Sequence, residues 1–318
     1  MSKFILAYTF FQQVLIAALI VSIPCAIIGT FVVIKRISMI SGSISHATFG
    51  GLAIANFIGI NPVIGGVVFG VLSGALVGVI KRRAKNRLDP ILSFIWAFGM
   101  ALGGIFLFIT EGYQGDLFSF MFGNILSIYF WDLIALIILT VIIVIVAILG
   151  FQAIQLVLFD EEYAEVRNIP IMLVNVVFYV LVALTIVVIV SIVGIVLLIA
   201  FLTLPAAISL YYQKTIKRTM IMSGIILAVS NTAGLFIAHY IELPPGPVIV
   251  VLLSILYVGS MIIDWLRKEI KKRNNPIEPH ACDIELESFG IFQNLIRDER
   301  VKEHSHESQQ PSKLSTEV

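Results

Sequence analysis

The chain has 318 residues, of which 59% are hydrophobic and only 13% carry a charged side chain. An ordinary soluble domain has roughly 45–50% apolar and about 25% charged residues, so this composition excludes a water-soluble fold for most of the chain. A formal net charge of +1 gives no overall attraction to nucleic acid, so no nucleic-acid partner is expected. Charged residues become dense near the carboxyl end. We expect a transmembrane domain at 1–266 and a cytoplasmic, polar, disordered tail at 267–318.

Apolar runs long enough to cross a bilayer follow one another along the chain. A spanning helix needs about 20 apolar residues, and every backbone polar group within lipid must be bonded internally. We therefore predict an all-α polytopic protein of the cell membrane with about nine transmembrane helices, between eight and ten. The predicted spans are 13–34, 44–60, 62–80, 90–109, 125–151, 171–190, 193–212, 219–239 and 247–266.

The apolar stretch from Ile171 to Tyr212 is about twice the length of a bilayer span. Almost no polar loop divides it, so the chain must change direction within a few residues. We expect a tight hairpin or a broken helix between Ser191 and Gly194.

Cationic residues in the connections occur on one predicted side of the membrane, apart from Lys3. Short loops rich in Lys and Arg remain in the cytoplasm. Nine alternating spans therefore place the amino terminus outside and the carboxyl terminus in the cytoplasm. The cationic residues expected in the cytoplasm are Lys35, Arg36, Lys81, Arg82, Arg83, Lys85, Arg87, Arg167, Lys214, Lys217, Arg218, Arg267, Lys268, Lys271, Lys272 and Arg273.

The predicted cytoplasmic segment 152–170 has the pattern of a short amphipathic helix. A docking surface for a soluble partner protein is one use for such a helix, and a position flat on the bilayer is the alternative. We expect Glu161 and Glu162 to face water. The predicted apolar stripe consists of Leu156, Phe159, Tyr163, Val166 and Ile169.

His46 is the leading candidate for a functional ionisable residue within the membrane. It follows Arg36 by ten residues, which a helix would convert to about 15 Å, half the depth of the bilayer core. An ionisable side chain at that depth costs about 2.5–3.5 kcal/mol on insertion scales. A neutral imidazole there can bind a divalent metal such as zinc, manganese, iron or nickel, relay a proton, or serve only as a hydrogen-bonded structural residue.

Sequence motifs of soluble enzymes are missing from the chain. It has no Gly-rich phosphate loop ending in Gly-Lys-Ser/Thr, no His-Glu-x-x-His and no Gly-x-Ser-x-Gly. We therefore expect that the chain is not itself an enzyme and binds no cofactor. If ATP drives it, another chain must bind the ATP.

Four sequence patterns occur in order over about residues 10–266. Together they resemble the permease subunits of the zinc/manganese/iron ABC importers. The patterns are Val33–Ile40 followed by Ile44–Ala47, then Leu158–Ala164, then Val193–Leu198 with Leu204–Ala207, and finally Leu243–Pro247.

This resemblance implies a homodimeric permease in the bilayer, driven by two copies of a cytoplasmic ABC ATPase. An extracytoplasmic metal-binding protein would deliver a divalent ion of the zinc, manganese or iron class, which is the transported cargo. The alternative function is a secondary, proton-coupled transporter of a metal ion or small solute with His46 as the relay. The resemblance also implies a segment that couples the permease to the ATPase, formed by Phe159, Asp160, Glu161, Glu162, Tyr163, Glu165 and Arg167.

The metal site of that family usually has an Asp followed four residues later by a His. Alignment on His46 places Gly42 at the position of the aspartate, so only His46 is carried over as a metal ligand. Without the carboxylate, the site should weaken for manganese more than for a softer metal.

Overall fold

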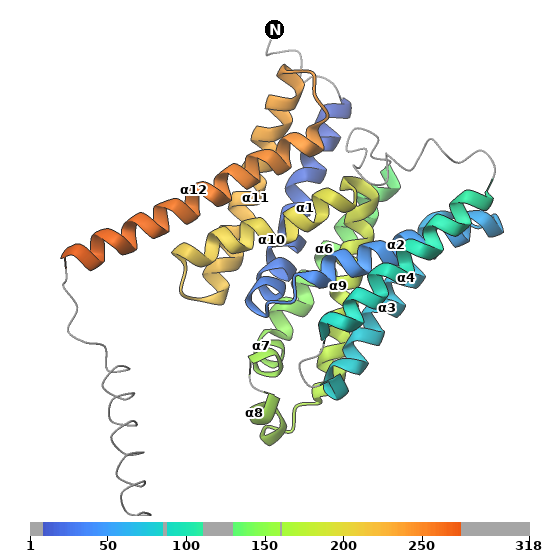
Figure 1. Ribbon diagram of the computed structural model, residues 1–318, viewed down its shortest axis with the longest axis horizontal. Coiled ribbons are helices and arrows are strands. Elements are labelled where there is room, and N and C mark those ends of the chain that lie inside the picture. The colour runs from blue at the N-terminus through green and yellow to red at the C-terminus, as the bar shows by residue number, and fades with distance from the viewer. Residues whose placement is uncertain (1–8, 85–87, 111–129, 160, 275–318) are drawn as a thin grey trace, which may run out of the picture. The chain divides into compact units, whose positions relative to one another are not determined.

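The computed structural model describes residues 9–84, 88–110, 130–159 and 161–274 (Figure 1). Every regular element in these ranges is an α-helix, which confirms the predicted all-α class. Asp160, the connection 111–129 and the predicted tail beyond Asn274 lie outside the described residues. The helices are Thr9–Ile34 (α1), Met39–Ile58 (α2), Pro62–Ala84 (α3), Leu88–Ile109 (α4), Phe130–Leu149 (α6), Phe151–Phe159 (α7), Glu161–Val166 (α8), Ile171–Val193 (α9), Ile195–Tyr212 (α10), Ile216–Tyr240 (α11) and Pro245–Asn274 (α12).

Seven helices in the described part of the chain are long and apolar enough to cross a membrane: α1, α3, α4, α6, α9, α11 and α12. The protein is therefore a multi-pass membrane protein. The long helix α2 is not among the seven. It is rich in Gly and Ser, and it is packed among α3, α4, α9 and α10, so it needs little apolar surface for contact with lipid. Helix α10 is also apolar but, with 18 residues, is shorter than each of the seven.

Helices α2, α3 and α4 lie side by side and approach one another through glycines (Figure 1). A Cβ atom on Gly99 of α4 would lie 2.5 Å from the carbonyl oxygen of His46 and 2.6 Å from the Cα atom of Ala47. A Cβ atom on Gly51 of α2 would collide with the carbonyl oxygen of Gly65 on α3. Small residues allow such backbone contact between membrane helices. The backbone of α2 is thus held from two sides near His46.

Helix α3 also packs closely against α9. A Cβ atom on Gly74 would lie 2.6 Å from the carbonyl oxygen of Tyr179, and one on Gly78 would lie 2.8 Å from the Cα atom of Val176. Because α3 contacts both α2 and α9 through backbone atoms, a displacement of α3 must move or strain its neighbours.

The long apolar stretch is interrupted at Gly194, which confirms the expected broken helix. Gly194 has φ 89° and ψ 164°, a backbone conformation that is essentially restricted to glycine. Its N–H donates to the carbonyl oxygen of Val190 at 2.9 Å, and its own carbonyl oxygen accepts from the N–H of Leu198 at 3.2 Å. Helix α9 therefore ends at Val193 and α10 begins at Ile195, so that Gly194 alone separates them.

The segment 152–170 forms two short helices, α7 and α8, rather than one. Its buried side chains are Ile154, Val157, Leu158 and Ala164. The predicted stripe is divided. Leu156 and Ile169 are partly buried and pack against the cluster of Val157, Ala164 and Ile171, whereas Phe159, Tyr163 and Val166 are exposed.

Candidate functional site

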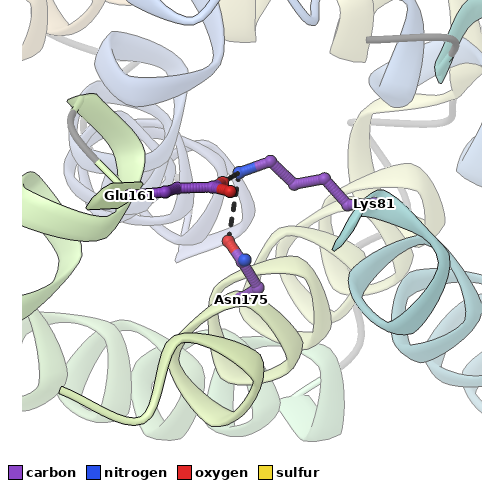
Figure 2. Close-up of polar contacts among 3 residues, drawn as sticks. All are labelled: Lys81, Glu161 and Asn175. Atoms are coloured by element: carbon purple, nitrogen blue, oxygen red, sulfur yellow. Dashed lines mark hydrogen bonds and ion pairs between the residues drawn. The ribbon is translucent and has the colours of Figure 1, made fainter. Parts of the chain in front are cut away.

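Lys81 connects three helices at one end of the bundle (Figure 2). Its Nζ atom lies 2.8 Å from the Oε1 atom of Glu161 on α8 and donates a hydrogen bond of 3.2 Å to the Oδ1 atom of Asn175 on α9. The Lys81 side chain is 16% exposed and that of Glu161 is 42% exposed. A charge-assisted contact of this kind is stronger when water is partly excluded. The short helix α8 is therefore attached by an ion pair to the end of α3.

A second lysine approaches the same segment from the end of α1. The Nζ atom of Lys35 lies 5.4 Å from the centre of the Phe159 ring, within the range of a cation–π contact. Burial and the neighbouring charge of Lys81 lower the pKa of Lys35, while the carboxylate of Glu161 acts in the opposite direction. Glu161 is thus the acidic partner that offsets two nearby ammonium groups.

The outer surface of α8 combines apolar and charged side chains. Val166 is 79% exposed, and Glu162 and Glu165 are also exposed. The guanidinium of Arg167 donates to the Tyr163 hydroxyl oxygen, at 3.0 Å from Nη2 and 3.2 Å from Nε. Both Glu161 and Glu162 were predicted to face water. Glu162 is exposed, as predicted. The carboxylate of Glu161 is instead paired with Lys81.

His46 lies within α2 and stacks on Trp96 of α4. The ring centroids are 4.8 Å apart and the ring planes are inclined by 21°. The Nδ1 atom of His46 is buried and has no hydrogen-bond partner among the described residues. A buried polar atom without a partner costs about 1–3 kcal/mol, so this nitrogen is available for a bond to another group.

Trp96 also covers Gly42, one helical turn before His46. A Cβ atom on Gly42 would lie 2.9 Å from the Cζ3 atom of the indole. The hydroxyls of Ser43 and Ser45 donate to carbonyl oxygens of their own helix, at 2.9 Å and 2.6 Å. Within the described ranges, no group of three or more His, Cys, Asp or Glu side chains could hold a metal ion. His46 is therefore a candidate single ligand beside an aromatic ring.

The model of the ABC 3 transport family matches residues 7–264. The chain belongs to the ABC 3 transport family.

Relatives of this ABC 3 protein support the assignment over most of its length. A Chlamydia pneumoniae chain named "Probable metal transport system membrane protein" is 31% identical over 277 residues, covering 85% of this chain and 92% of that relative. The manganese import system permease protein ScaB of Streptococcus gordonii is 27% identical over 266 residues, covering 84% and 95%. The solved structure of PsaBC from Streptococcus pneumoniae in complex with Fab matches with a TM-score of 0.70 and 28% identity, over 80% of this chain and 91% of that one.

The family assignment confirms the resemblance inferred from the four sequence patterns and identifies the ABC 3 chain as part of a transporter. Sequence reasoning did not find two residues that shape its candidate sites. In the sequence, Lys81 indicates only the side of the membrane on which its connection lies, although a lysine at the end of a span can also bind a carboxylate. Trp96 lies in an apolar run of the sequence. No sequence pattern indicates that its ring stacks on His46.

Proposed function

We propose that the chain is the permease subunit of an ATP-driven ABC importer, which moves a divalent metal ion of the zinc, manganese or iron class into the cytoplasm. The observation that carries this proposal is the family match over 7–264. Relatives named for manganese import and chelated iron transport support the cargo class. The cargo is a substrate, and ATP is hydrolysed on a separate chain.

We further propose nine spans, with the amino terminus outside and the carboxyl terminus in the cytoplasm. The described residues contain nine helices of at least 18 residues: α1, α2, α3, α4, α6, α9, α10, α11 and α12. Lys35, Lys81 and Glu161 come from three connections assigned to the same side, and they lie close together. Their proximity supports this topology. The proposed boundary between the transmembrane domain and the tail, near residue 266, falls within α12, which continues to Asn274.

In this proposal, the segment from Phe159 to Arg167 docks on the cytoplasmic ATPase. The exposed side chains of Phe159, Tyr163 and Val166 provide apolar contact area, and the acidic residues of α8 provide charge for recognition. The ion pair between Glu161 and Lys81 connects this surface to α3, which contacts α2. A movement of α8 can thereby reach the helix that carries His46. Two permease chains, two ATPase copies and an extracytoplasmic metal-binding protein complete the proposed importer.

Substitution of Val166 by Asp should reduce co-purification of the ATPase with the tagged permease by about tenfold, because a carboxylate then enters an apolar contact. Lys214→Asp is the matched control, since Lys214 is exposed on a different connection of the same proposed side. Quantitative mass spectrometry of complexes from native membranes measures the ratio of the two subunits. If the tagged wild type captures no ABC ATPase, the importer proposal fails and the proton-coupled alternative gains support.

We assign His46 as a metal ligand on the transport path. In a deletion strain, the wild-type gene should restore the cellular content of one metal, while His46→Ala should restore it at a rate lower by about tenfold or more. His239→Ala is the control, because that histidine lies at the end of α11 against Phe11. Elemental mass spectrometry of metal-limited cells gives the contents. Full restoration by His46→Ala would remove the ligand assignment while leaving transport intact.

A further inference from the structure

We propose that Arg36, in the turn between α1 and α2, binds a carboxylate of the cytoplasmic ATPase. This contact lies beside the segment from Phe159 to Arg167 and forms a second point of attachment for the same partner. The assignment rests on the proposed import function and extends its docking surface to another connection of the chain.

The backbone of Arg36 has a conformation that favours glycine, with a φ angle of 57°. The N–H of Arg36 donates to the carbonyl oxygen of Val33 at 3.0 Å, and the N–H of Ile37 donates to that of Val32 at 3.1 Å. These two bonds end α1 in a Schellman turn, in which the residue at this position is usually glycine and sometimes asparagine. Arginine here therefore costs conformational free energy that glycine would avoid.

Two other helix ends in the described part of the chain adopt the same turn with residues that tolerate it. At the end of α2, Gly59 has φ 80° and its N–H donates to the carbonyl oxygen of Asn56 at 3.1 Å. At the end of α8, Asn168 has φ 56° and its N–H donates to that of Glu165 at 2.9 Å. The turn itself thus needs no guanidinium. An arginine held in a strained conformation points to a use for its side chain.

The turn that carries Arg36 lies beside the proposed docking segment. The Nζ atom of Lys35 is 5.4 Å from the centre of the Phe159 ring, and one turn earlier on α1 the ring centroids of Phe31 and Phe151 are 6.2 Å apart. The end of α1 is therefore held along α7 by contacts at both ends of that short helix. Because Phe159 is 52% exposed, a partner that covers its ring also reaches the neighbouring turn.

The charges on this surface favour a protein over a lipid as the partner of Arg36. The residue is exposed, and its guanidinium has no ion-pair or hydrogen-bond partner within the described residues. On α8, Glu162 and Glu165 are exposed as well. An anionic bilayer surface attracts Arg36 but repels these carboxylates, whereas a protein can present an acid to the one and bases to the others. A guanidinium binds a carboxylate through two parallel hydrogen bonds, and arginine is enriched in protein interfaces.

Arg36→Gly and Arg36→Asn both remove the guanidinium and suit the left-handed backbone. We expect each to lower co-purification of the ABC ATPase with the tagged full-length permease by about tenfold, measured by quantitative mass spectrometry. The temperature of thermal unfolding should not fall, because glycine and asparagine tolerate this conformation. A loss of the partner without a loss of stability separates a binding role from a structural one.

Glu242→Gly is the matched control. Glu242 has φ 54° at the end of α11, so the substitution relieves the same kind of strain, but this helix end is assigned to the opposite side of the membrane. Its capture of the ATPase should equal that of the wild type. Ionic strength gives a second measurement: added salt should weaken capture by the wild type more steeply than capture by Arg36→Asn, because salt screens the ion pair.

Capture at the wild-type level by both Arg36 variants would overturn the assignment while leaving the import proposal intact. Loss of bound anionic lipid from these variants, with unchanged capture of the ATPase, would overturn it in favour of a lipid phosphate. An equal loss of capture in Glu242→Gly would also overturn it, since the effect would then be general. If the wild type itself captures no ABC ATPase, the proposed import function fails as well.

Discussion

Reversal of either charge in the pair formed by Lys81 and Glu161 should lower ATP-driven metal uptake by about tenfold, and reversal of both should restore most of it. Glu161→Lys would bring a third ammonium group close to Lys81 and Lys35. The Lys81 side chain is largely buried, so an unpaired charge there costs at least about 1–3 kcal/mol. The lowest-energy response is for α8 to move away from α3, which breaks the proposed connection between the ATPase and α2.

Two controls separate this connection from general effects of charge. Lys214→Glu reverses an exposed charge on a connection outside the proposed docking segment and should leave the pair intact. The ion pair between Lys268 and Asp264 has an N–O distance of 2.7 Å but joins residues one turn apart on α12, with the lysine 75% exposed. Exchange of those two residues should matter little, because such helix pairs contribute about 0.3–0.5 kcal/mol.

Uptake of radioactive metal and the ATPase activity of the purified complex together measure coupling. We expect the single reversals to lower uptake more than ATP hydrolysis, which is the pattern of an uncoupled transporter. An exchanged pair that transports no better than either single reversal would show that the ion pair does not transmit the movement.

Gly99→Ala should destabilise the protein by about 1–3 kcal/mol and slow metal uptake in the same variant. The added methyl group meets the carbonyl of His46 and the backbone of Ala47, which cannot rotate aside as a side chain can. Helix α2 must then shift at His46, the proposed metal ligand. Gly104→Ala is a closely matched control, because it lies on the same helix and its Cβ atom would meet nothing within 4 Å.

At Gly104 the substitution should be neutral or slightly stabilising, since alanine is favoured over glycine in a helix by roughly 0.5–1 kcal/mol. Thermal unfolding in detergent and uptake in cells are measured for both variants. Equal stability and equal uptake of Gly99→Ala and Gly104→Ala would contradict the close contact between α2 and α4.

The helices could be predicted from the sequence because each depends on neighbours along the chain. The length of an apolar run is set by bilayer thickness, and the break at Gly194 lies where an apolar stretch is too long for one span. The partners of Lys81 could not be predicted in this way. Asn175 is 94 positions away from it, and helical periodicity relates only residues a few positions apart.

The faces of α7 and α8 show a second limit of prediction from the sequence. A periodic pattern identifies apolar residues on one side of a helix, but it does not say whether that side meets the protein, lipid or a partner. Val157 and Ala164 are buried against the rest of the chain, while Val166 of the predicted stripe is exposed. Likewise, the sequence showed that Gly42 has no side chain, but only the packing of α4 showed that Trp96 fills the space.

The single-residue junction at Gly194 limits how α9 and α10 can rotate relative to each other. Hydrogen bonds of the two helices reach Gly194 from both sides, so a rotation that keeps those helices intact can use only the φ and ψ torsions of this residue. A loop of several residues would offer many combinations of torsions, whereas this junction offers two degrees of freedom. Any reorientation of α10 relative to α9 that keeps both helices intact therefore pivots at Gly194 and changes only these two torsions.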